Sequence, residues 1–136
     1  MAGFIVDCSI ALAWCFPDEE TPATKILLDR MNDEAAVVPA LWFIEITNVL
    51  ALSEKKGRID RAKVAEFIAL IEEFELDVDH EASRLAFSHL LPLCRAHQLT
   101  SYDAAYLELA LRRHLPLSTL DKQLTNAAKK LGVKVL

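Results

Sequence analysis

The sequence predicts an α/β protein, a three-layer α/β/α sandwich with a central parallel sheet of about five strands. Two observations support this fold class. Short apolar runs alternate with longer segments of helical periodicity along the whole chain, and no repeat, low-complexity tract or linker interrupts them. Strands that alternate with helices form parallel sheets with helices on both faces. A length of 136 residues fits one compact domain spanning residues 1–136.

The strands are expected in short apolar or β-branched runs. These are Phe4–Val6, Ala35–Val38, Leu76–Val78, Leu115–Ser118 and Val133–Val135. Pro39 ends the second run, and Pro116 stands at the start of the fourth, where proline is tolerated. In a parallel sheet of this kind, ligands bind beyond the carboxyl ends of the strands, near the switch in strand order.

The helices are expected between these runs. They are Ala11–Cys15, Thr21–Met31, Leu41–Lys55, a helix capped by Asp60 that continues to Phe74, His80–Ala96, Ser101–His114 and Lys122–Leu131. Ser9 is expected to cap the first helix, which leaves Asp7 free to face the ligand crevice. The Leu41–Lys55 helix is apolar on nearly all sides, so we expect it to be buried. Gly57 is placed to end it.

Composition indicates a globular protein of the cytoplasm. Apolar residues make up 53% and charged residues 26% of the chain. No apolar run approaches the roughly 18 residues of a membrane span, and the N-terminus lacks the basic region of a secretory signal. The three cysteines are an odd number with no C-x-x-C pair, so neither a disulfide framework nor a zinc knuckle is expected. A net charge of −5 argues against nucleic-acid binding by bulk electrostatics.

Four acidic residues are candidates for a site, although each has an ordinary explanation. Asp7 follows a strand and can serve a turn. Asp103 lies in the first turn of a helix, where it favours the helix dipole, and Asp121 can cap the last long helix. Glu45 is less easily explained, because its helix is apolar and no lysine or arginine precedes Lys55 in that segment. Its carboxylate therefore requires either an ion pair with another element or a metal ion.

Their positions relative to the strands strengthen the metal interpretation. Asp7 and Asp121 each follow a strand, Asp103 opens a helix that leads into one, and Glu45 lies early in the helix after the second strand. All four are thus expected at one edge of the sheet. Such a cluster repels itself unless it binds a hard divalent cation, and Mg²⁺ and Mn²⁺ prefer oxygen ligands. With a phosphodiester substrate, bound metals would generate hydroxide, orient the phosphate and stabilise the leaving oxygen.

Four motifs in order carry a family resemblance. They are Ile5–Trp14, Pro39–Leu50 with Glu45 and Asn48, Leu99–Ala110 around Asp103, and Pro116–Leu124 with Asp121, followed by Gly132 and Val133. With these motifs the whole chain resembles PIN-domain proteins, and specifically the VapC ribonuclease toxins of type II toxin–antitoxin systems. The resemblance implies the PIN-like α/β/α fold and an endonuclease that depends on Mg²⁺ or Mn²⁺ and cuts RNA.

The resemblance also implies roles for individual residues. Asp7, Glu45, Asp103 and Asp121 would be the catalytic acids of the metal site, with Asp7 and Asp103 as direct ligands. Ser9, Asn48 and Thr119 fall at polar positions that support the site in the family, and their expected task is to aim the carboxylates by hydrogen bonding.

The expected partners are RNA, a VapB-like antitoxin protein and a second copy of the chain in a homodimer, with no membrane. Two alternatives share the fold: a PIN nuclease for housekeeping RNA processing, and a catalytically idle PIN module used for binding. A phosphotransfer domain of the receiver or dehalogenase type is disfavoured, because no second aspartate follows two residues after Asp7.

Overall fold

The computed structural model describes residues 3–136 and shows a four-stranded parallel sheet. The strands are β1 (Phe4–Val6), β2 (Ala36–Pro39), β3 (Leu76–Asp79) and β4 (Leu117–Ser118). Their order is β3-β2-β1-β4, so β1 is central and the strand order reverses beside it. Ile5 pairs with Val37 on one side and Leu117 on the other. The predicted parallel sheet is confirmed.

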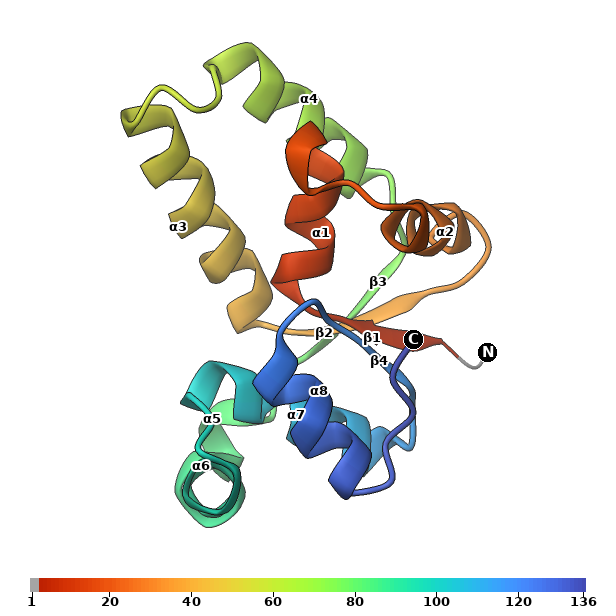
Figure 1. The fold of residues 1–136 in the computed structure, drawn as a ribbon, viewed down its shortest axis with the longest axis vertical. Helices are drawn as coiled ribbons and strands as arrows, with labels where there is room; N and C mark the ends of the chain where they lie inside the picture. The colour runs from red at the N-terminus through yellow and green to blue at the C-terminus, as the bar shows by residue number, and fades with distance from the viewer. Residues whose placement is uncertain (1–2) are drawn as a thin grey trace.

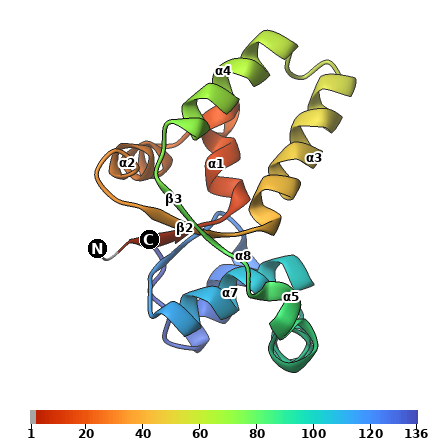
Figure 2. The ribbon, with the colours of Figure 1, turned by 180° about the vertical axis from the view of Figure 1, so that it is seen from behind.

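Helices cover both faces of this sheet (Figures 1 and 2). On one side lie α1 (Cys8–Cys15), the short 3-10 helix η1 (Pro17–Glu19), α2 (Pro22–Arg30), α3 (Leu41–Lys55) and α4 (Arg61–Glu72). On the other side lie α5 (Ala82–Leu85), the π-helical segment η2 (Ala86–Leu90), α6 (Leu91–His97), α7 (Ser101–Arg113) and α8 (Lys122–Lys130). This arrangement confirms the three-layer α/β/α sandwich.

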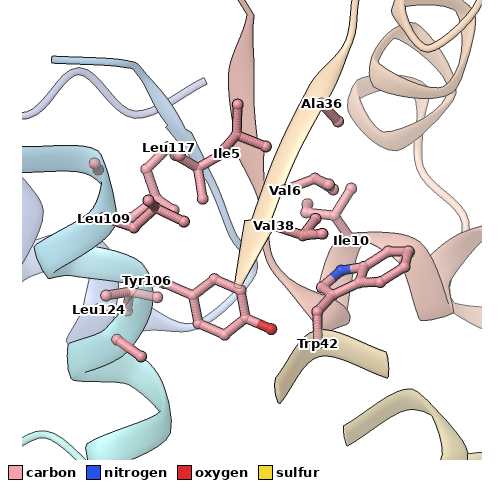
Figure 3. Close-up of a cluster of buried hydrophobic side chains, with 14 of the residues drawn as sticks. Ile5, Val6, Ile10, Ala36, Val38, Trp42, Tyr106, Leu109, Leu117 and Leu124 are labelled. Carbon is pink, nitrogen blue, oxygen red and sulfur yellow. The ribbon is translucent and has the colours of Figure 1, made fainter. Parts of the chain in front are cut away.

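The hydrophobic core lies on both faces of the central strands. Figure 3 shows Ile5 and Leu117 facing Leu109 of α7, while Val6 and Val38 lie near Trp42 of α3. Each of these side chains is fully or almost fully buried. The core thus fixes α3 and α7 against the same strands, and these two helices carry two of the candidate acids.

The predicted fifth strand is reduced to a single bridge. Leu117 alone pairs with Val135, through hydrogen bonds with Lys134 and Leu136. Strand β4 is itself short because Pro116 has no N–H to extend the ladder; its carbonyl accepts from Ile5. The sheet therefore has four strands rather than five.

Two further expectations about helices are wrong. Helix α3 is not buried all round: Ile44 is 71% exposed, and Phe43 and Leu52 are also exposed, because the sheet covers only one side of the helix. Ser9 does not cap the first helix. Asp7 caps it instead, so the helix begins at Cys8, three residues before the predicted start at Ala11, and Ser9 lies inside the first turn.

An ion-pair network joins the edge strand β3 to α7. Arg112 donates to both oxygens of Asp79, at 2.9 and 2.8 Å, and to Glu108 one turn earlier. Asp79 and Glu108 are buried, and Arg113 adds contacts to Asp77 and Asp79. Arg112 holds the pKa of Asp79 down at about 2. The positive charge of Arg112 therefore compensates the negative charges of the two buried carboxylates, Asp79 and Glu108.

No helix within residues 3–136 is long and apolar enough to cross a membrane.

Candidate acidic site

The four candidate acids lie in one electrostatic neighbourhood beyond the carboxyl ends of the central strands. Asp7 directly follows β1, Asp121 lies between β4 and α8, Glu45 is in the second turn of α3, and Asp103 is in the first turn of α7. The charge of Glu45 acts on Asp7, and the charges of Asp121 and Asp7 act on Asp103. The fold thus brings together Asp7 and Asp121, which are 114 positions apart in the chain.

Asp7 is buried and held by three hydrogen bonds. Its Oδ1 accepts from Ser9 Oγ at 2.5 Å and from the Ile10 N–H at 3.2 Å, and its Oδ2 accepts from the Thr119 hydroxyl. The bond from Ile10 is the helix cap that was predicted for Ser9. Only 3% of Asp7 is exposed. Oδ2, with a single donor, keeps acceptor capacity for a further partner.

The loop between β4 and α8 positions the two hydroxyls that hold Asp7. Its Leu120 N–H donates to Ser9 Oγ and its Asp121 N–H donates to Thr119 Oγ1, both at 3.0 Å. Ser9 and Thr119 therefore both donate hydrogen bonds to the Asp7 carboxylate. That these bonds aim it toward a metal ion stays a prediction from the family resemblance.

Glu45 is half-buried and receives its hydrogen bond from α7. The Tyr106 hydroxyl donates to Glu45 Oε1 at 2.6 Å, and the Cys8 thiol also stabilises the charged form of this carboxylate. Neither group carries a positive charge, so the carboxylate keeps its net charge. The ion pair with another element, one of the two alternatives for Glu45, is absent from residues 3–136.

Asp103 and Asp121 lie at the starts of two helices. Thr100 caps α7 by accepting from the Asp103 N–H at 3.2 Å, and Asp121 caps α8 by accepting from Leu124 at 2.8 Å. The ordinary explanation of Asp121 as a cap is therefore correct, and it involves only one carboxylate oxygen. Asn48 is exposed on α3, and no hydrogen bond within the described chain joins it to an acid, so its supporting role stays a prediction.

Burial and mutual repulsion raise the pKa values of these acids. Desolvation raises the pKa of Asp7 to about 6, despite the lowering effect of its hydrogen bonds. Desolvation and then the charges of Asp121 and Asp7 raise the pKa of Asp103 to about 6. Desolvation also raises the pKa of Glu45, against the effect of Tyr106. Raised values in three neighbouring carboxyl groups indicate a region of negative potential without a countercharge.

The contrast with the other buried acids is informative. Asp79 and Glu108 share Arg112, whereas Asp7, Glu45 and Asp103 take part in no ion pair among residues 3–136. Buried charges in proteins are paired or coordinate metal ions. The donor set at this site consists of carboxylates and hydroxyls, which suits a hard cation.

The side chains of the four candidate acids do not form a compact cluster. Within residues 3–136, no group of three histidine, cysteine, aspartate or glutamate side chains is compact enough to hold a metal ion. The charges of the acids act on one another. A cation could contact all four carboxylates only if their oxygens moved closer together.

Sequence reasoning did not assign roles to Tyr106 and Cys8. The available signal for Tyr106 was its spacing, three residues after Asp103 on one helix, which places both side chains on the same face. For Cys8 the signal was its position beside Asp7. The partner of both, Glu45, became known only from the packing of α3 against α1 and from the hydrogen bond that Tyr106 of α7 makes to it.

Comparisons with known proteins agree with this architecture. No curated protein sequence matches the chain. Among solved structures, it is similar to the one titled "Crystal structure of PAE2754 from Pyrobaculum aerophilum", with a TM-score of 0.70 and 22% sequence identity. That match covers 98% of this chain and 83% of the other. The sequence also matches the PIN domain family over residues 4–130, which include all four candidate acids, and the chain therefore belongs to the PIN domain family.

Proposed function

We propose that the chain is an endoribonuclease that depends on Mg²⁺ or Mn²⁺ and acts in the cytoplasm as the toxin of a VapBC-type pair. PIN domains are generally metal-dependent nucleases. The observation that carries the proposal is the set of three acids, Asp7, Glu45 and Asp103, that are wholly or half buried without any cationic partner in the described residues. A divalent cation would offset the burial and the mutual repulsion that raise their pKa values.

In this proposal Asp7 and Asp103 hold the cation directly, and Glu45 and Asp121 complete the acidic set. When bound, a divalent cation activates water and offsets the negative charge of the phosphodiester. The chain's own contribution is orientation. Ser9 and the β4–α8 loop keep Asp7 in one geometry, and the position of Asp103 in the first turn of α7 keeps it close to Asp7 and Asp121.

The first experiment incubates the purified protein with end-labelled structured RNA in Mg²⁺, in Mn²⁺ and in EDTA. Wild-type protein and an Asp29→Asn variant, which changes an exposed aspartate of α2, should cut RNA only with metal. An Asp103→Asn variant should lose the activity. Cleavage that survives in Asp103→Asn, or that persists in EDTA, would contradict the proposal and indicate contamination.

The partner proposals are a basic antitoxin segment and a second copy of the chain. An acidic neighbourhood in a chain of net charge −5 is complementary to a basic peptide. A reading frame directly upstream, whose product binds the chain and suppresses its RNA cleavage, would support the toxin role over housekeeping RNA processing. Size-exclusion chromatography with light scattering tests the homodimer.

One observation favours the idle binding module as a second candidate. The acids are not gathered into a compact metal cluster in the described chain. Titration calorimetry with Mn²⁺ decides between the two: heat of binding in wild-type protein that is lost in Asp103→Asn supports the nuclease, and no heat in either supports the idle module.

A further inference from the structure

Tyr106 joins the two helices that carry Glu45 and Asp103. It lies on α7, three residues after Asp103, and only 1% of it is exposed. Its hydroxyl donates to Glu45 Oε1 of α3 at 2.6 Å, across 61 positions of sequence. Figure 3 shows its ring beside Leu109 and Leu124, with the hydroxyl oxygen pointing toward α3.

Core packing explains the ring but not the hydroxyl. A phenylalanine would fill the same space, whereas a buried phenol requires a hydrogen-bond partner. The partner here is a carboxylate with no cation beside it in residues 3–136. Elsewhere in the protein a buried carboxylate, Asp79, is both held and neutralised by Arg112. A neutral phenol differs because it fixes the carboxylate's position and leaves its negative charge in place.

The phenol is also a dependable donor. Burial, followed by the charge of Glu45, raises the pKa of Tyr106 well above its usual value. The geometry itself fixes the direction of the bond: at 2.6 Å from an ionised carboxylate oxygen, which has no proton to give, the phenol is the donor.

We propose that Tyr106 is a positioning residue, which holds Glu45 in place for the divalent cation that the acidic site binds. The proposal rests on the proposed function, since it requires that the site binds such a cation. One face of α7 then makes two contributions: Asp103 supplies a carboxylate, and Tyr106 aims the carboxylate supplied by α3. Loss of a hydrogen bond of this kind typically weakens metal affinity 10- to 100-fold.

The test measures Mn²⁺ affinity by titration calorimetry in wild type, Tyr106→Phe and Tyr102→Phe. Tyr102 is a matched control, since it lies on the same helix, is 58% exposed and contributes no hydrogen bond among the described residues. Tyr106→Phe should weaken Mn²⁺ binding about 10- to 100-fold, and Tyr102→Phe should leave it unchanged. Both changes are repeated in a Glu45→Gln background, where Tyr106→Phe should have an effect of less than about twofold.

The results separate this inference from the proposed function. If wild type binds Mn²⁺ and Tyr106→Phe binds it equally well, Tyr106 only packs the core and the inference is overturned while the nuclease proposal stands. If Tyr106→Phe weakens binding equally with Glu45 and with Gln at that position, it acts by loosening the fold, which also overturns the inference. If wild type binds no Mn²⁺, both proposals fail.

A second measurement serves if Tyr106→Phe does not fold. The chain has two tyrosines, so 3-fluorotyrosine incorporated into Tyr102→Phe protein labels Tyr106 alone. Saturating Mg²⁺ should shift its fluorine resonance, and the shift should be lost in the Glu45→Gln background. A resonance that Mg²⁺ leaves unmoved while calorimetry shows binding would overturn the inference.

Discussion

Replacing Asp7 with asparagine is expected to stabilise the metal-free protein while it removes nuclease activity. Asp7 is 3% exposed and its pKa is raised to about 6, mainly by burial. At pH 7.5 the carboxylate is charged, and no cation among the described residues compensates for its burial. Asparagine removes this cost but also removes the carboxylate that is proposed to hold the metal ion.

The magnitude follows from the shift in pKa. A change from 3.8 to about 6 corresponds to roughly 3 kcal/mol at neutral pH, since each unit contributes about 1.4 kcal/mol. The asparagine oxygen can still accept from Ser9 and Ile10, and its amide can donate to Thr119. The hydrogen bonds to the Asp7 carboxylate are charge-assisted, and those to asparagine would be weaker, which cancels part of this stabilisation. We therefore expect a net stabilisation of about 1–2 kcal/mol.

The assay is urea unfolding followed by circular dichroism at pH 7.5 in EDTA, with Asp29→Asn as the control. Asp7→Asn should have the higher free energy of unfolding in EDTA, and the difference should shrink near pH 4, where Asp7 of the wild type is protonated. Added Mg²⁺ should stabilise the wild type and leave the variant unchanged. A variant that is less stable than the wild type in EDTA by more than about 1 kcal/mol would refute the reasoning.

Three further outcomes are expected. In EDTA, the free energy of unfolding of the wild type should fall as pH rises from about 4 to 6, because the folded state binds the Asp7 proton more tightly than the unfolded state does. It should also fall below pH 4, where protonation of Asp79, with a folded pKa of about 2, removes the stabilisation by its ion pair. A flat profile in urea titrations would contradict this. Thr119→Val should lower single-turnover RNA cleavage about 10- to 100-fold and cost about 1–3 kcal/mol of stability, because Asp7 and the Asp121 N–H lose a hydrogen-bond partner; unchanged cleavage would show that its hydroxyl does not aim Asp7. Arg112→Met should cost about 3–5 kcal/mol of stability, because it leaves the buried Glu108 without a cation and the buried Asp79 with Arg113 alone; a loss below 1 kcal/mol in urea unfolding would count against the network.

Most of the fold was predictable because its signals are local. The apolar runs of β1, β2 and β3 were placed to within one residue, and α3 was predicted with the bounds it has, since Pro39 and Gly57 frame it. The last predicted strand is present only as a parallel bridge from Leu117 to Val135, because its pairing depends on how much of β4 remains free to bond, which the run Val133–Val135 does not encode.

The helix cap shows a subtler limit. Asp7 and Ser9 are both residue types that cap helices well, and they lie two positions apart. In the folded chain the Ser9 hydroxyl accepts a hydrogen bond from the Leu120 N–H, which is 111 positions away in sequence, and Asp7 caps the helix. The burial of α3 was overestimated for a related reason: an apolar helix face such as that of Ile44 does not by itself show whether another element packs against it.

The site was predictable as a set of acids but not as a network. Strand ends and helix starts place carboxylates at one edge of a parallel sheet from the sequence alone. The hydrogen bond from Tyr106 to Glu45 depends on the packing of α7 and α3 against the sheet, and no spacing rule reaches across 61 residues.

The placement of β1 in the middle of the sheet has a consequence for the protein's synthesis. Asp7 is made before the Thr119 hydroxyl that completes its hydrogen bonding, which follows 112 positions later. A chain emerging from the ribosome cannot close its central strand between β2 and β4 until that late segment is free. The hydrogen bonding of Asp7 is therefore completed only after the β4–α8 loop has been made, so the candidate site is one of the last parts of this fold to form.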